Sequence, residues 1–299
     1  MEHTHSHGHI TRNITRAFVW GIGLNISFTL IEFILGYYYN SLALIADASH
    51  NLSDVASLIL SLIGFRLAQK AASKLYTYGY KKSTILASLI NSVVLVFIVI
   101  GILREAIERL NTLPEVGGIG IIITAGIGII INTVSAFLFF KNQKNDINIR
   151  GAFVHLLVDA LVSVGVVISG IIILYTNIKV IDPIISIIIA LIIALTTWNI
   201  LKESLRLIID AVPKDINYNK IESIVNTIPE VINVHHMHIW AISSNINGLT
   251  AHIIVDKSNF QKIEIIKRDI KNILSENNIQ HSTLEFEFSD EECMTENCH

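Results

Sequence analysis

Two polar motifs of the same spacing interrupt long apolar stretches of this sequence. His50 and Asp54 stand four residues apart in one stretch, and His155 and Asp159 repeat the pattern in another. Residues four apart lie on the same face of a helix, so each motif can present an imidazole and a carboxylate side by side. Two imidazoles and two carboxylates together are a four-coordinate ligand set suited to Zn²⁺.

A single His–Asp pair in an apolar helix also has a structural interpretation. It could form a buried hydrogen bond that holds two membrane helices together. Ionisable groups are costly inside a membrane, however, and where they occur they usually mark an ion pathway. The repetition of the motif with identical spacing therefore favours ion binding over a structural role.

The composition limits the class of protein. The chain has 299 residues, of which 52% are hydrophobic and 16% are charged. About a quarter of the residues in soluble proteins are charged, so this balance predicts a protein embedded in a lipid bilayer. The formal net charge of -3 gives no reason to expect nucleic-acid binding. A G-x-x-x-x-G-K-[ST] phosphate loop is also missing from the sequence. The chain is therefore not expected to be an enzyme, and transport would need an energy source other than an ATPase within it.

Six apolar segments each approach the roughly 20 residues that span a bilayer as a helix. The predicted spans are 17–38, 42–66, 84–104, 117–140, 151–175 and 182–202. Lys and Arg gather before the first span and in the loops that follow the second and fourth spans. Basic loops of this kind are cytoplasmic. We therefore expect a multi-pass protein of the cell membrane with both termini in the cytoplasm.

This topology places the two motifs at a similar depth. The span 42–66 runs from outside to inside, and the span 151–175 runs in the opposite direction. At a rise of 1.5 Å per residue, the four ligands lie within about 10 Å of one another in depth, near the bilayer centre. A single site at mid-depth is what an alternating-access carrier requires. Glu32 and Asn132, which also lie in predicted spans, are expected to form hydrogen bonds between helices.

From Asp210 onward the composition becomes that of a soluble domain. Hydrophobic periodicity and turn residues predict a helix at 217–228, a strand at 231–242, a hairpin turn at 245–248, a strand at 249–256, a helix at 260–275 and a strand at 283–288. The order αββαβ predicts a small α+β domain with its helices on one sheet face. The expected divisions are a His-rich tail (1–15), the transmembrane domain (16–208), a metal-binding α+β domain (209–290) and a Cys/His tail (291–299).

Histidines recur outside the membrane segments. The soluble domain carries His235, His236, His238, His252 and His281. Clustered His side chains predict a second metal site in this domain. In a regular strand His236 and His238 share one face and His235 takes the other. The alternating His residues of the N-terminal tail are either a loose metal-collecting tract or a tail without function.

Taken together, these motifs resemble the cation diffusion facilitator family, and its zinc-transporting branch in particular. The resemblance covers nearly the whole chain. It rests on residues 41–54, Tyr76-Thr-Tyr-Gly-Tyr80, His155-x-x-x-Asp159, Asp182-Pro183 and His235-x-x-His238-Ile-Trp240. It implies a homodimer of six-helix protomers, each with a cytoplasmic ferredoxin-like domain. It also implies that metal is exchanged for protons through a central site.

The resemblance also assigns site residues. The transport site would be His50, Asp54, His155 and Asp159, and a His at position 50 favours Zn²⁺ over manganese or iron. The cytoplasmic metal site would be His235, His252, His281 and Glu287. Some members bind a further ion with terminal residues, here Cys293 and Cys298 with His5 or His7, but this cysteine spacing is wider than C-x-x-C. Residues 67–82 contain no His or Asp, so the loop metal site of other members is expected to be absent.

The sequence thus predicts a Zn²⁺/H⁺ antiporter that exports zinc from the cytoplasm and also holds zinc as a structural or regulatory ion. Two alternatives stay open. One is a carrier of the same family for Cd²⁺ and Co²⁺ or for Mn²⁺ and Fe²⁺. The other is a membrane-anchored metal sensor that uses the His tail and the soluble domain. A sensor needs no set of ligands at mid-membrane, so zinc-dependent proton movement separates it from a carrier.

Overall fold

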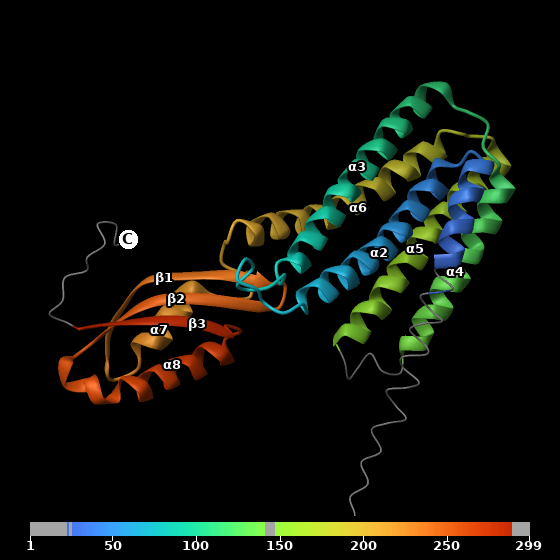
Figure 1. Ribbon diagram of the computed structural model, residues 1–299. Coiled ribbons are helices and arrows are strands. Elements are labelled where there is room, and N and C mark those ends of the chain that lie inside the picture. Colours follow the sequence, from blue (N-terminus) through green and yellow to red (C-terminus); the bar gives the residue numbers. More distant parts are fainter. Residues whose placement is uncertain (1–22, 24–25, 141–146, 289–299) are drawn as a thin grey trace, which may run out of the picture. The chain divides into compact units, whose positions relative to one another are not determined.

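The computed structural model describes residues 23, 26–140 and 147–288 (Figure 1). The chain groups into two compact units. One comprises residues 1–58 and 93–198, and the other comprises residues 59–92 and 199–299.

Long apolar helices account for most of the described residues between 26 and 208. They are a helix at Ile26–Tyr38, α2 (Leu42–Ala68), α3 (Ser83–Thr112), α4 (Gly118–Phe140), α5 (Ile147–Thr176) and α6 (Ile181–Ile208). Within the described residues, α3, most of α4 and α5, and α6 are long and apolar enough to cross a bilayer. The predicted helical transmembrane domain is therefore confirmed.

The count of six spans stays a prediction. The predicted span 42–66 falls on α2, a helix of 27 residues that carries Asp47, His50 and Asp54. The predicted span 17–38 is described from Ile26 onward, where it is helical to Tyr38.

Large apolar side chains cover the outer surfaces of these helices. Phe97 and Leu195 are each 71% exposed, and Ile130 is 63% exposed. A continuous apolar surface of this kind is unfavourable in water and is satisfied by contact with lipid. The exposed side chains therefore support a bilayer environment independently of the sequence pattern.

The start of α2 is anchored by a buried carboxylate from α6. Asp182 is fully buried, and its Oδ1 accepts a hydrogen bond of 2.5 Å from Ser41 Oγ. Its other oxygen accepts a hydrogen bond of 2.8 Å from the Leu42 N–H. The first N–H groups of a helix have no partner within the helix, and the helix dipole favours a negative charge beside them. Asp182 therefore joins the N-termini of α2 and α6.

Replacing Asp182 by Ala should lower the free energy of unfolding by about 3 kcal/mol, because the substitution leaves several buried donors unpaired. The measurement is denaturant unfolding of the purified protein in detergent. Asp182→Asn keeps one acceptor and should give an intermediate loss. A variant with Ala at this position that unfolds like the wild type would contradict the anchoring role.

Helices α4 and α5 approach each other closely at glycines. A Cβ atom at Gly170 would lie 2.9 Å from Ile122 Cγ1 and 3.1 Å from the Gly118 carbonyl oxygen. Small residues permit this close packing of membrane helices. The contact matters for the site because it fixes the position of α5, which carries His155 and Asp159.

The C-terminal domain follows the predicted order αββαβ. Its elements are α7 (Tyr218–Asn226), β1 (Val231–Ser243), β2 (Ile246–Val255), a 3₁₀ turn (Lys257–Lys262), α8 (Ile263–Glu276) and β3 (His281–Phe288). The strands lie in the order β1-β2-β3, with β1 antiparallel and β3 parallel to β2. The two helices lie against one face of the sheet (Figure 1), and Ile253, Ile266 and Ile270 are buried between them.

The hairpin between β1 and β2 differs from the prediction. The predicted turn at 245–248 is wrong, because Ser243 already pairs with Ile246 and the turn consists of residues 244 and 245. Asn247 belongs to β2 instead. Its N–H donates to Gln280 Oε1 and its side-chain amide donates to the Asn278 carbonyl. These bonds hold Asn247 in β2, so the general preference of asparagine for turns does not decide where the chain reverses.

Candidate metal centres

Helices α2 and α5 bring the two His–Asp motifs together. Two distances cross between the helices: His155 Nε2 lies 3.1 Å from Asp54 Oδ2, and His50 Nε2 lies 3.5 Å from Asp159 Oδ1. The pairs within each helix are similar, at 3.7 Å for His50 and Asp54 and 3.6 Å for His155 and Asp159. The structure therefore brings the four sequence-predicted residues into contact across α2 and α5.

These separations match the geometry of a tetrahedral zinc site. Zn²⁺ binds nitrogen and oxygen ligands at about 2.0 Å, which puts neighbouring ligand atoms about 3.3 Å apart. The four imidazole–carboxylate distances of 3.1 to 3.7 Å fall around that value. The two rings lie farther apart, with their centroids separated by 6.1 Å. One ligand atom each from Asp54, His155 and Asp159 lies within 4.8 Å of the others, and His50 is not part of this closer group.

The carboxylates of Asp54 and Asp159 differ in their exposure to solvent. Asp159 is 1% exposed, whereas Asp54 is 37% exposed and His155 is 46% exposed. Oδ2 of Asp54 and both oxygens of Asp159 have no hydrogen-bond partner among the described residues. Buried carboxylate oxygens are normally paired, so free ones that face two imidazoles are suited to binding a cation. Their unequal exposure shows that one side of the site is more accessible than the other.

A second link between the two helices lies one turn from the site. Ser163 Oγ of α5 donates a hydrogen bond of 2.9 Å to Asp47 Oδ2 of α2. Both side chains are buried. This bond fixes the relative register of α2 and α5, and thereby the distance between the two motifs.

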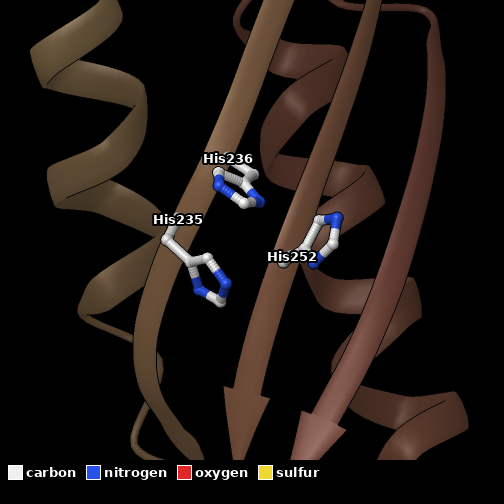
Figure 2. Close-up of side chains that lie close together, drawn as sticks. All are labelled: His235, His236 and His252. Carbon is white, nitrogen blue, oxygen red and sulfur yellow. The ribbon is translucent and has the colours of Figure 1, made fainter. Parts of the chain in front are cut away.

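Figure 2 shows a second cluster, made of three imidazoles from neighbouring strands. His235 of β1 lies directly opposite His252 of β2 in the antiparallel register. The ring nitrogens of His235, His236 and His252 lie within 4.8 Å of one another. The parallel pairing of β2 with β3 adds two carboxylates, because it sets Glu285 opposite His252.

The carboxylates of β3 contact these rings. Glu287 Oε2 lies 3.3 Å from His235 Nε2, and its Oε1 contacts His252 Nδ1. Glu285 Oε2 lies 3.5 Å from His252 Nε2. Both ring nitrogens of His235 are buried and have no hydrogen-bond partner within the described part of the chain. A set of imidazoles and carboxylates with such free nitrogens fits Zn²⁺ or a similar borderline cation.

His236 joins the cluster because β1 is irregular at this point. The register shifts between His235 and His238, and His236 has a φ of +48°. A bulge with a left-handed residue interrupts the alternation of side chains between the two sheet faces. The His235 and His236 rings therefore lie 5.1 Å apart on the same side, while His238 is exposed. The expectation that His235 and His236 occupy opposite faces is wrong for this reason.

The structure places the remaining predicted ligands elsewhere. His281 begins β3 opposite Gly248, four residues before Glu285, and its ring contacts Tyr78 at a centroid distance of 5.5 Å. Four residues of strand correspond to about 13 Å, so His281 stands apart from the cluster. Cys293, Cys298, His5 and His7 lie outside the described residues. His236 and Glu285 were missed by sequence reasoning, which could detect neither the bulge nor the β2–β3 register.

Comparisons with known proteins agree with this architecture. Residues 19–209 match the family model of the cation efflux transmembrane domain. Residues 213–287 match the model of the cation efflux protein cytoplasmic domain. Together the two models cover nearly all of the chain that the structure describes.

Three relatives illustrate the similarity. The "cadmium, cobalt and zinc/H(+)-K(+) antiporter" of Bacillus subtilis is 35% identical over 96% of this chain and 92% of its own length. The "metal cation efflux system protein CzcD" of Cupriavidus metallidurans is 34% identical over 95% of this chain and 90% of its own length. The "zinc transporter ZitB" of Escherichia coli is 32% identical over 100% of this chain and 96% of its own length.

These matches extend through both domains, and the apolar helices and the α+β domain are the parts that they describe. The chain therefore belongs to the cation efflux family, the cation diffusion facilitators, and is a multi-pass membrane transporter with a cytoplasmic C-terminal domain.

Proposed function

We propose that this protein is a Zn²⁺/H⁺ antiporter that moves zinc out of the cytoplasm across the cell membrane. The observation that carries the proposal is the set of imidazole–carboxylate distances at His50, Asp54, His155 and Asp159, which fit a tetrahedral zinc ion. The six-span topology with both termini in the cytoplasm belongs to the same proposal. The names of the relatives from B. subtilis and E. coli, which include zinc, support it.

The mechanism follows from competition between protons and metal for the same atoms. Zinc binds neutral imidazole and ionised carboxylate, so protonation of either weakens metal binding. The ordinary pKa of imidazole, near 6.5, lies within the working range of pH. When the site opens to an acidic exterior, protons take the nitrogens of His50 and His155 and zinc leaves. When it opens to the cytoplasm, the protons are lost and zinc binds again.

The test is zinc-dependent proton movement in proteoliposomes that contain the purified protein. Zinc flux should increase as the compartment that receives zinc is made more acidic, and it should stop when the proton gradient is collapsed. A membrane-anchored sensor would bind zinc but move neither ion. Zinc flux that ignores the pH gradient would refute proton exchange.

Related ions define the second candidate function. The name of the B. subtilis relative also includes cadmium and cobalt as cargo, and potassium beside protons as the exchanged ion. A carrier of Cd²⁺ and Co²⁺ is therefore the nearest alternative, and an alkali cation is a second candidate counter-ion. Flux of each metal, measured singly and in competition with zinc, distinguishes these possibilities.

Replacing His50 by Asp should shift the metal preference toward Mn²⁺. Carboxylate oxygen suits harder cations than imidazole does, so the ratio of Zn²⁺ flux to Mn²⁺ flux should fall by at least roughly tenfold. The measurement compares the two fluxes in the same proteoliposome preparation, with His238→Asp as a control outside the membrane site. An unchanged ratio would show that position 50 does not set selectivity.

The cytoplasmic domain would hold a resident ion and join two protomers. We assign the ion to His235, His236, His252 and Glu287, with Glu285 beside them. Bound there, zinc would tie β1, β2 and β3 together through a single centre. The homodimer expected from the resemblance remains part of the proposal. The molecular mass of the purified protein in detergent would test it directly.

A further inference from the structure

The segment that joins α2 to α3 carries positive charge and no acidic residue. Residues 55–103 contain no Asp or Glu, and all of their basic residues lie within 66–82, which we call the basic loop. These residues are Arg66, Lys70, Lys74, Lys81 and Lys82. Lys82 forms an ion pair of 2.6 Å with Asp210. The other four form no ion pair within the part of the chain that the structure describes, so the basic loop keeps four uncompensated charges.

The basic loop has a defined conformation. The Tyr76 carbonyl oxygen accepts hydrogen bonds from the N–H groups of Ser73 and Gly79, at 3.0 and 2.8 Å. Gly79 has a φ of +69°, and a Cβ atom there would lie 3.0 Å from the Lys70 carbonyl oxygen. Glycine adopts this left-handed conformation without strain and permits the close approach. The two ends of the loop therefore meet, and the side chains between them are held in fixed places.

This conformation exposes apolar and aromatic side chains beside the charges. Leu75 is 82% exposed, and Tyr76 and Tyr80 are also exposed. The Tyr76 and Tyr80 rings lie 4.7 Å apart, and the Lys70 ammonium lies 5.8 Å from the centre of the Tyr80 ring. Tyr and Lys side chains with apolar neighbours are typical of the boundary between lipid and water, because each has an apolar body and a polar end.

The adjoining helices place the basic loop at the edge of their apolar surfaces. On α2 the exposed apolar side chains continue to Phe65, and Arg66 follows directly. On α3 they begin at Leu86, shortly after Lys81. In a bilayer the change from an apolar to a basic surface falls at the level of the phosphate groups. The cations of the loop are therefore within reach of lipid headgroups.

The contacts of the basic loop place it on the cytoplasmic side of the protein. Lys82 pairs with Asp210, which follows α6, and the Tyr78 ring contacts His281 at a centroid distance of 5.5 Å. His281 belongs to the matched cytoplasmic domain, and both segments lie in the same compact unit. The cytoplasmic leaflet contains anionic lipids and attracts basic segments beside membrane helices. The charge of the loop is thus complementary to that of the leaflet beside it.

We propose that the basic loop is a binding surface for anionic phospholipids of the cytoplasmic leaflet. Its unpaired cations bind lipid phosphate, Leu75 contacts the acyl chains, and the Tyr76 and Tyr80 rings lie at the level of the headgroups. Bound lipid holds the cytoplasmic end of α2, the helix that carries His50 and Asp54. The inference is independent of the cargo and does not rest on the proposed function.

A partner protein with an acidic surface would also supply negative charge. The basic loop, however, continues the exposed apolar surfaces of α2 and α3 at both of its ends. Lipid that covers those helices therefore reaches the loop without a gap. An exposed Leu75 among cations matches a surface that combines phosphate groups with hydrocarbon, and a phospholipid has both.

The experiment measures which lipids stay bound to the purified full-length protein. The protein is reconstituted in vesicles of phosphatidylcholine and phosphatidylglycerol in equal parts and extracted in an uncharged detergent, and the ratio of the two bound lipids is determined. The wild type should retain phosphatidylglycerol in preference. Each Lys or Arg near an anionic surface strengthens association roughly fivefold. Lys70→Gln, Lys74→Gln and Lys81→Gln in one variant should therefore lower that preference by at least roughly tenfold.

Matched variants separate the effect of charge in the basic loop from other effects. Removing the same amount of charge from α8 should leave the preference unchanged, and this control variant carries Lys267→Gln, Arg268→Gln and Lys271→Gln. Replacing the loop lysines by arginine keeps the charge and should also keep the preference, and this variant carries Lys70→Arg, Lys74→Arg and Lys81→Arg. The elution volume in detergent shows that each variant is folded.

Three results would overturn the proposal. One is an unchanged preference for phosphatidylglycerol in the variant with glutamine at the three loop lysines. Another is displacement of bound phosphatidylglycerol by an equal concentration of soluble glycerol phosphate, which would show that the loop recognises free phosphate. The third is a molecular mass in detergent that falls in the same variant, which would show that the loop joins two copies of the chain.

Discussion

Replacing Asp159 or Asp54 by Ala is expected to abolish zinc transport while leaving the protein inserted and folded. Asp159 is 1% exposed and faces both imidazoles. Its replacement by Ala removes a negatively charged metal ligand, and a water molecule in its place would not supply that charge. Loss of an outer partner of a metal ligand lowers affinity or activity roughly 10–100-fold, and loss of the ligand itself should exceed that range. The measurement is zinc uptake into proteoliposomes driven by a pH gradient.

The control for this prediction is Glu108→Ala, which removes an exposed carboxylate from α3. It should transport zinc like the wild type. Elution profile in detergent and the amount of reconstituted protein show whether each variant is folded and inserted. If Asp54→Ala and Asp159→Ala both retained zinc flux, the assignment of the transport site would be incorrect.

Removing the cytoplasmic cluster is expected to eliminate a zinc ion and the stability that it provides. An ion that binds the folded state at a thousand times its dissociation constant stabilises that state by about 4 kcal/mol. In an Asp159→Ala background, where the transport site is disabled, zinc should still raise the thermal midpoint of the protein. Adding His236→Ala or His252→Ala should remove that increase, as measured by thermal unfolding with and without zinc.

Two neighbouring histidines provide matched comparisons. His238 lies two residues after His236 in the same strand but is exposed and outside the cluster, so His238→Ala should keep the zinc response. His281 is the ligand that the family resemblance implies, and the structure sets it beside Tyr78 instead. If His281→Ala removed the zinc response and His236→Ala did not, the cluster formed by the bulge would not be the binding site.

Much of the cluster proposed as the transport site could be predicted from the sequence because its geometry is local. His50 with Asp54, and His155 with Asp159, share a face on any helix, and membrane helices are strongly specified by apolar length. Their convergence required only that two helices predicted to run in opposite directions be neighbours. The order αββαβ was equally accessible, because it follows from hydrophobic periodicity within short segments.

The cluster in the cytoplasmic domain depends on a bulge and on strand register, and hydrophobic periodicity predicts neither of them. Side chains alternate along a regular strand, but the bulge after His235 places His236 on the same side as its neighbour. Glu285 reaches His252 because β3 pairs in parallel with β2, and that register is set by the packing of α8 and the sheet. The hairpin turn shifted for a similar reason, since Asn247 found its partners in the segment before β3.

The sequence by itself therefore determined which residues of the apolar helices could bind metal, because helix geometry fixes their spacing. Only the tertiary structure decided which histidines meet in the cytoplasmic domain, because strand register and a bulge depend on contacts between distant segments. It also decided that Glu32 and Asp47 are fully buried and that Asp47 pairs with Ser163 of α5. Burial is a property of the packed fold, and no local pattern of residues specifies it.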